Sequence, residues 1–271
     1  MKAVDIISFL SGLILCRLLT PYIYMLLKEN KCVSNNYQNK IIPIGIGIVF
    51  LFVQSIICFG VIFIVYNDNI NIYAYIFCIT IMGFVGFIDD VIGNNVIKGF
   101  KGHIKALIVG RLTTGGLKAV SGLVCSIIYS IIISENIYNL LINIIIISLF
   151  TNLINLLDLR PGRAIKAFFI ISVLLLCTSL KLRYNFLIFS AIGIILVVFP
   201  LDLRGKVMLG DVGSNSLGMT LGIFCVTTQS INYKIIILII LVFLHVFSEY
   251  YSFSKVISKL KVLNFIDSLG R

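Results

Sequence analysis

Residues 72–90 read IYAYIFCITIMGFVGFIDD, an apolar run of bilayer-spanning length that ends on two adjacent aspartates. A transmembrane helix needs about 20 predominantly apolar residues. Because similar runs recur along the chain, we predict nine spans, at about 4–27, 43–66, 71–89, 118–134, 139–157, 164–180, 184–200, 212–229 and 233–251. The expected fold is an all-α polytopic transmembrane helix bundle, in which residues 1–271 form a single integral-membrane domain.

Composition agrees with this fold class. The chain has 271 residues, of which 59% are hydrophobic and 12% are charged, whereas a soluble domain carries about twice that charged fraction. These values exclude a disordered chain, a collagen and a disulfide scaffold. The seven cysteines contain no C-x-x-C pair, so neither a zinc site nor a disulfide framework is indicated.

The basic residues indicate an orientation. Of 22 Lys and Arg, 17 lie in 28–42, 90–118, 158–166, 201–211 and 252–271, and four lie in the alternate set of loops. The positive-inside rule therefore places the first set in the cytoplasm, with the amino terminus outside and the carboxy terminus cytoplasmic. The same rule explains the net charge of +11 without nucleic acid as a partner.

Two acidic motifs lie at predicted helix ends. Asp89 and Asp90 close the third span, where adjacent carboxylates repel each other unless a cation or basic groups offset them. Such hard oxygen ligands suit Mg²⁺, and a solvated helix end is the alternative interpretation. Asp211 lies between two glycines at the start of the eighth span. It either caps that helix or marks a place where backbone amides approach a phosphate.

A polar stripe ends the fifth span. Asn152, Asn155 and Asp158 follow one another at a spacing that puts them on one helix face. Interhelical hydrogen bonding is the alternative interpretation for the two asparagines. It accounts less well for Asp158, which is followed at once by Arg160 and Arg163 around a Pro-Gly turn.

A basic, glycine-rich loop at 98–116 follows the aspartate pair and contains Lys105. Its lysines either bind anionic lipid heads or clamp phosphates above the carboxylates.

Taken in their order along the chain, these motifs resemble those of the polyprenyl-phosphate N-acetylhexosamine-1-phosphate transferases. That family includes phospho-N-acetylmuramoyl-pentapeptide transferase and several GlcNAc-1-phosphate transferases. The resemblance runs from about Pro43 to Gly218. It matches Asp89 and Asp90 to the family's aspartate pair, Asn155 and Asp158 to its Asn-x-x-Asp element, Asp211 to its metal-binding aspartate, and Lys105 to its loop lysine.

The resemblance implies transfer of a sugar-1-phosphate from a UDP-N-acetylhexosamine to polyprenyl (undecaprenyl) phosphate, with release of UMP. The reaction would take place at the cytoplasmic face of a bacterial cell membrane, in cell-wall or surface-polysaccharide synthesis. Mg²⁺ is the expected cofactor and Mn²⁺ the alternative; membrane lipid is an expected partner, and a homodimer stays open. The expected roles are catalytic for Asp89, Asp90, Asp158 and Lys105, substrate-binding for Asn152, Asn155, Arg160 and Arg163, and metal-binding for Asp211 and Asp90.

Three departures from the family pattern bear on the substrate. Pro161 stands where the family often has a second aspartate, the chain has no His-His-His motif like that of the pentapeptide transferases, and the predicted spans are fewer. We therefore expect a simple UDP-N-acetylhexosamine to be a better donor than a peptide-bearing one. Two alternative functions remain, a transporter or flippase for a phosphorylated lipid and a non-catalytic membrane relative of the enzyme.

Overall fold

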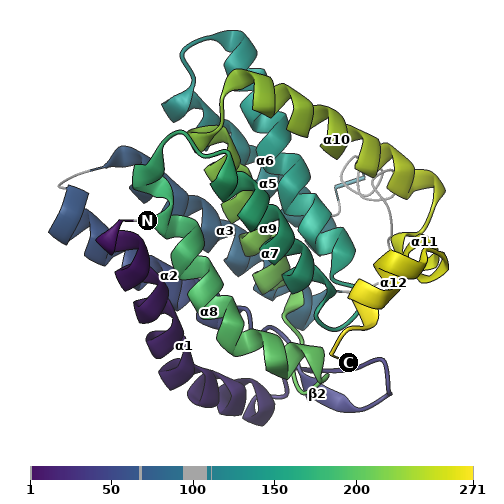
Figure 1. Ribbon diagram of the computed structural model, residues 1–271. Coiled ribbons are helices and arrows are strands. Elements are labelled where there is room, and N and C mark those ends of the chain that lie inside the picture. The colour runs from purple at the N-terminus through teal and green to yellow at the C-terminus, as the bar shows by residue number, and fades with distance from the viewer. Residues whose placement is uncertain (1, 67–68, 94–108, 111, 271) are drawn as a thin grey trace.

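The structure is a computed structural model that describes residues 2–66, 69–93, 109–110 and 112–270. It is a bundle of helices with one small hairpin (Figure 1). In chain order, the elements are α1 (Ala3–Glu29), β1 (Val33–Asn35), β2 (Ile41–Pro43), α2 (Ile48–Val61), η1 (Ile62–Tyr66), α3 (Ile70–Ile92), α5 (Thr114–Ile133), α6 (Ile137–Leu157), α7 (Arg163–Cys177), η2 (Leu182–Tyr184), α8 (Phe186–Leu203), α9 (Gly210–Thr228), α10 (Ile231–Tyr250), α11 (Phe253–Lys259) and α12 (Lys261–Ser268).

Each of the nine predicted spans falls on a helix. Within the described residues, seven helical segments are long and apolar enough to cross a membrane. These are Ala3–Glu29, Ile48–Tyr66, Ile70–Ile92, Thr114–Ile133, Ile137–Leu157, Leu182–Leu203 and Ile231–Tyr250. The two remaining predicted spans are α7, which has only 15 residues, and α9, which is rich in Gly, Ser and Thr. A multi-pass helical bundle is therefore confirmed, while the count of nine and the orientation stay predictions.

Helix α9 forms the centre of the bundle (Figure 1). Every residue from Val212 to Thr228 is buried, and the helix packs against α3, α6, α7 and α8. Small side chains at helix interfaces let backbones approach closely inside a membrane. The hydroxyls of Ser216 and Thr220 donate to backbone carbonyls one turn earlier, so these polar groups are satisfied within the helix itself.

The hairpin β1–β2 lies between α1 and α2 in the chain, and the residues that follow it pair with the backbone just before α9. Its strands pair antiparallel, and Ile44 then forms a parallel bridge with Met208. The amides of Gly45 and Ile46 donate to the Met208 carbonyl at 3.1 and 3.2 Å. The second span was predicted from residue 43, but its helix begins at Ile48 because the preceding backbone is committed to this pairing.

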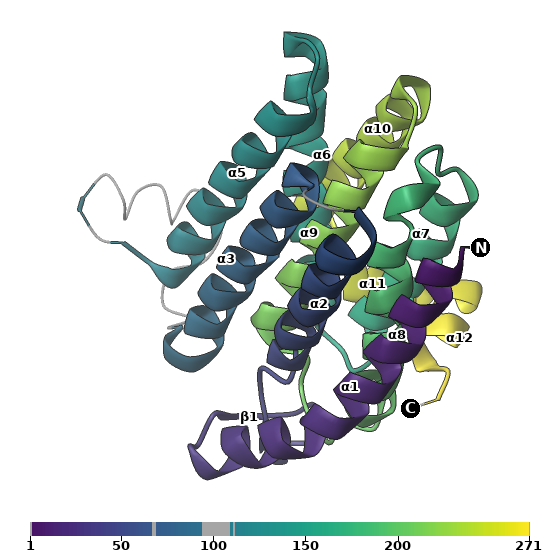
Figure 2. The same ribbon diagram turned by 90° about the vertical axis from the view of Figure 1, so that its left-hand side faces the viewer.

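The predicted motifs gather at one end of the bundle. Helices α3, α6 and α8 end there, and α5, α7 and α9 begin there. Figure 2 shows this end at the bottom, together with the hairpin and the carboxy terminus. We call it the acidic end, because Asp89, Asp90, Asp158 and Asp211 all lie at these helix termini.

Candidate active site

The centre of the acidic end is a pair of carboxylates that share one ammonium group. Asp89 lies in the last turn of α3, Asp211 in the first turn of α9 and Lys118 in the second turn of α5. Lys118 Nζ donates to Asp89 Oδ2 at 3.0 Å and also to Asp211 Oδ2. All three side chains are 20–24% exposed, so water reaches the cluster and its charges are only partly screened.

The second aspartate of the pair has a different role in this geometry. Asp90 accepts hydrogen bonds from the backbone amides of Asp211 at 2.8 Å and Val212 at 3.1 Å. A carboxylate at these first amides satisfies free donors and interacts well with the helix dipole. Asp90, reaching across from α3, therefore caps α9, and the carboxylate of Asp211 does not.

Two glycines make this close approach feasible. Gly210 has a φ of +76°, and a Cβ there would lie 2.5 Å from Asp90 Oδ2. Gly86, one turn before the aspartate pair, would place a Cβ 2.5 Å from the Asp211 carbonyl oxygen. A side chain at either position would push α3 and α9 apart and separate Asp89 from Asp211.

An amide relay connects α6 to the same helix start. Asn155 Nδ2 donates to Asn215 Oδ1 at 2.9 Å, and Asn215 Nδ2 donates to the Asp211 carbonyl at 2.6 Å. Asn215 is 2% exposed, so the central residue of this path is buried. The structure thus brings Asn155, predicted from the sequence, next to Asp211, whereas Asn152 is exposed on α6.

Asp158 directly follows α6, as the capping residue at its carboxyl end. Burial raises the pKa of its carboxyl well above the ordinary value, and the charges of Asp202, Asp211 and Asp90 raise that pKa further. Like charges act this way only over short distances. The catalytic role expected of Asp158 stays a prediction.

The predicted basic residues are not all at this centre. The Arg163 guanidinium binds Asp267 through two hydrogen bonds of 2.8 and 2.9 Å, and Arg160 is exposed. Lys105 lies outside the described residues. Among the residues that the structure describes, Lys118 is the basic side chain that contacts Asp89 and Asp211.

Three residues of this region were missed as site residues. Lys118 was counted as a loop charge, although a lysine in the second turn of an apolar span is itself a functional signal. Asn215 lies four residues after Asp211, on the same helix face. Asp202 is 4% exposed and bonds the amides of Gly162 at 2.7 Å and Leu209 at 3.1 Å. These two partners are backbone groups, which no side-chain pattern reveals.

Two carboxylates of the acidic end are candidates for holding a magnesium ion. In the part of the chain that the structure describes, no group of three or more His, Cys, Asp and Glu side chains could hold a metal by itself. Mg²⁺ is, however, commonly bound by one or two carboxylates together with waters and substrate phosphates. Asp89 and Asp211 converge on one cationic group, so these two carboxylates could hold such an ion together with a substrate phosphate.

A cavity opens beside the hairpin at the acidic end. Its volume is about 620 Å³, within the ~300–1,000 Å³ typical of small-molecule sites. Basic side chains on its wall are Lys40, Arg204 and Lys206, and Tyr24 and Ile42 add apolar surface. Such a cavity suits a ligand with an anionic group and a flat or apolar part.

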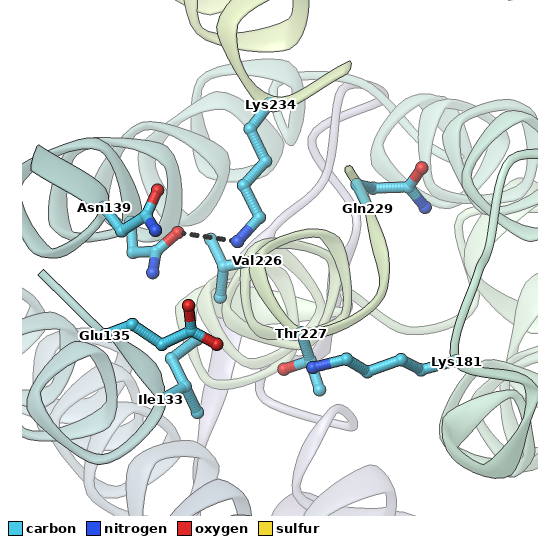
Figure 3. Close-up of a pocket in the computed structure, with 9 residues that line it drawn as sticks. Ile133, Glu135, Asn139, Lys181, Val226, Thr227, Gln229 and Lys234 are labelled. Atoms are coloured by element: carbon cyan, nitrogen blue, oxygen red, sulfur yellow. Dashed lines mark hydrogen bonds between the residues drawn. The ribbon is translucent and has the colours of Figure 1, made fainter. Parts of the chain in front are cut away.

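A smaller polar pocket of about 110 Å³ lies between the other ends of α5, α6 and α9 (Figure 3). Glu135, Lys181 and Lys234 line it, and Lys234 Nζ donates to Asn143 Oδ1 at 3.1 Å. A helix rises about 1.5 Å per residue, so the length of α6 separates this pocket from Asn155 by most of a membrane thickness. It is not part of the acidic centre.

Comparison with known proteins identifies the family. The profile of "Glycosyl transferase family 4" matches residues 72–229, more than half of the chain, and that range contains Asp89, Asp90, Lys118, Asp158 and Asp211. A comparison with curated protein sequences finds no match. The profile match confirms the resemblance that the motifs indicated. The chain belongs to glycosyl transferase family 4, the family of phospho-MurNAc-pentapeptide transferase and the polyprenyl-phosphate hexosamine-1-phosphate transferases.

Proposed function

We propose that this protein transfers N-acetylhexosamine-1-phosphate from a UDP-sugar to polyprenyl phosphate at the cytoplasmic membrane face. An oxygen of the lipid phosphate forms a bond to the sugar-bearing phosphorus. The bond from that phosphorus to the bridging oxygen breaks, and UMP leaves with that oxygen. The products are a lipid-linked sugar diphosphate and UMP.

The observation that carries this proposal is the cluster of Asp89, Lys118 and Asp211 at helix ends. Phosphoryl transfer depends mainly on positioning and on neutralising charge as the bond breaks. Alternating carboxylates and an ammonium at one level of the bundle supply sites for a cation and for phosphate oxygens side by side. A location at the membrane surface suits one lipid substrate and one water-soluble substrate.

Each residue then has a defined task. Asp211 and Asp89 would hold Mg²⁺, which when bound would neutralise the diphosphate and the leaving UMP. Lys118, which lies between the two carboxylates, would bind a phosphate oxygen of the substrate. Asp90 fixes the start of α9 through two amides, and Asn155 holds α6 against it through Asn215. Both are positioning residues in this proposal.

The cavity beside the hairpin is our candidate for the nucleotide-sugar site. Lys40, Arg204 and Lys206 complement a diphosphate. Residues 43–47, which follow Lys40 along the chain, pair with residues 208 and 209, three and two positions before Asp211. This pairing connects the chain beside the cavity to the start of α9, which carries Asp211.

The transporter alternative has less support. A transporter that moves protons or cations needs ionisable side chains deep in the membrane, whereas the carboxylates of this site lie at helix ends. The polar side chains buried deeper in the bundle include Gln54, Tyr75 and Thr220, which hydrogen-bond one another as neutral groups.

A comparison of donors tests the proposal. Purified protein with polyprenyl phosphate should release UMP from UDP-GlcNAc, and labelled sugar should appear in the lipid in equal amount. UDP-MurNAc-pentapeptide should be the poorer donor, because the described loops are short. Preferential use of the pentapeptide donor would reassign the protein to peptidoglycan precursor synthesis. Lipid movement across vesicles without UMP release would show a transporter, and neither activity would show a non-catalytic relative.

A further inference from the structure

The last helix, α12, presents its apolar side away from the protein. Val262 and Phe265 lie one helical turn apart, and Leu269 directly follows the helix; the three are 71%, 65% and 55% exposed. Asp267, on the opposite side, is 7% exposed. In a soluble protein an amphipathic helix packs the other way round, with its apolar stripe toward the core.

Ionic contacts fix this orientation. Asp267 accepts two hydrogen bonds from Arg163, the first residue of α7, and Arg163 Nη1 also donates to Ser254 at 2.8 Å. Lys166, one turn further along α7, donates to the carbonyls of Ile266, Asp267 and Leu269 at 2.8–2.9 Å. Because these bonds hold the polar side of α12 against α7, the helix cannot rotate its apolar stripe inward without breaking them.

The position of the tail identifies what covers the stripe. The membrane-spanning helix α10 ends at Tyr250, and α11 begins at Phe253. The tail therefore emerges at the level at which a span ends, and Figure 1 shows α11 and α12 at the edge of the bundle beside the end of α10. Helices with an apolar stripe and flanking lysines bind in the plane of the membrane interface, and Lys255, Lys259 and Lys261 are all exposed here.

We propose that α12 lies in the membrane interface, with Val262, Phe265 and Leu269 against lipid chains and the three lysines near anionic head groups. The occupant of the exposed stripe is thus an anionic lipid surface and not a second protein. This placement fastens α7 and the turn at residues 158–162 to the membrane surface. It does not depend on the catalytic activity proposed above.

The absence of tryptophan from the sequence allows a direct test. Phe265→Trp introduces a single tryptophan on the apolar stripe, and Asn264→Trp is the matched control at an exposed position on the other side. The full-length variants are placed in nanodiscs of phosphatidylcholine and phosphatidylglycerol, with and without brominated acyl chains. The bromines should remove most of the tryptophan emission of the Phe265→Trp variant and little of that of the Asn264→Trp control.

A second set of variants tests the lysines. Replacing Lys255, Lys259 and Lys261 together by glutamine in the Phe265→Trp background, or omitting phosphatidylglycerol, should reduce the quenching by bromine. Equal quenching of the stripe variant and the control, or no quenching of the stripe variant, would overturn the proposal. A blue shift of the stripe tryptophan that depends on the number of protein copies per nanodisc would also overturn it, because the stripe would then be a contact between two copies.

Discussion

Replacing Lys118 by methionine tests the electrostatics of the acidic centre. The ammonium donates to Asp89 at 3.0 Å and to Asp211, so its removal leaves two neighbouring carboxylates without their shared counter-charge. In metal-free buffer the variant should therefore unfold at a lower temperature than the wild-type protein. Mg²⁺ should restore most of the loss, because a divalent cation supplies the missing positive charge.

The expected size follows from the burial of the cluster. Removing one partner of a fully buried ion pair costs about 3–5 kcal/mol, and an exposed pair contributes only about 0–1 kcal/mol. The three side chains are 20–24% exposed, so an intermediate loss of about 2 kcal/mol is expected. For a chain of this size that loss corresponds to about 4–8 °C in the unfolding midpoint.

Thermal unfolding in detergent, with EDTA and then with Mg²⁺, measures both effects. Lys118→Arg keeps the charge and should stay near the wild-type midpoint, and Lys28→Met removes an exposed lysine and should change little. An equal loss in EDTA and in Mg²⁺, or no loss in either, would refute the view that Lys118 neutralises the carboxylate pair.

Further predictions concern the tail, the cavity and the orientation. Asp267→Asn should lower the free energy of unfolding by about 3–5 kcal/mol, because it leaves the buried Arg163 guanidinium without its carboxylate. The double variant Arg163→Leu with Asp267→Leu should lose less of that free energy, and thermal unfolding of the two variants measures the difference. Arg204→Gln should raise the KM for UDP-GlcNAc about tenfold, the effect of one lost charged hydrogen bond, without changing the KM for polyprenyl phosphate in a UMP-release assay. With Cys32 and Cys177 replaced by serine, an impermeant maleimide should label Tyr138→Cys in intact cells and not Lys259→Cys; the reverse pattern would contradict the orientation.

Much of the fold could be predicted because membrane helices are recognisable from the length of their apolar runs. The hairpin could not, because its strands are three residues long and the bridge that follows it joins Ile44 to Met208. The structure of the carboxy-terminal tail, α11 and α12, could be predicted only in part. Val262, Phe265, Ile266 and Leu269 follow a helical stripe, but its partner contacts join Arg163 to a residue 104 positions away, and no local pattern contains such information.

At the site, the acidic residues could be identified from the sequence, but the different contacts that each of them makes could not. Asp89 and Asp90 are adjacent, yet one binds Lys118 and the other caps α9. A helical turn of about 100° per residue separates the directions of neighbouring side chains, so the packing of α3 against α9 decides which carboxylate faces which partner. Lys118 could not be singled out from the sequence, because the positive-inside rule already accounts for a basic residue at that position. A basic residue with a second role looks the same in that pattern.

The central claim is that Asp211 and its neighbours form a phosphoglycosyl-transfer centre. Release of UMP from UDP-GlcNAc by the purified protein, with polyprenyl phosphate and Mg²⁺, measures it directly, with Asp211→Asn compared at saturating Mg²⁺. We predict that the wild-type protein releases UMP only when lipid phosphate and Mg²⁺ are both present, and that Asp211→Asn folds normally but loses nearly all turnover. Near-normal UMP release by a correctly folded Asp211→Asn would contradict this account.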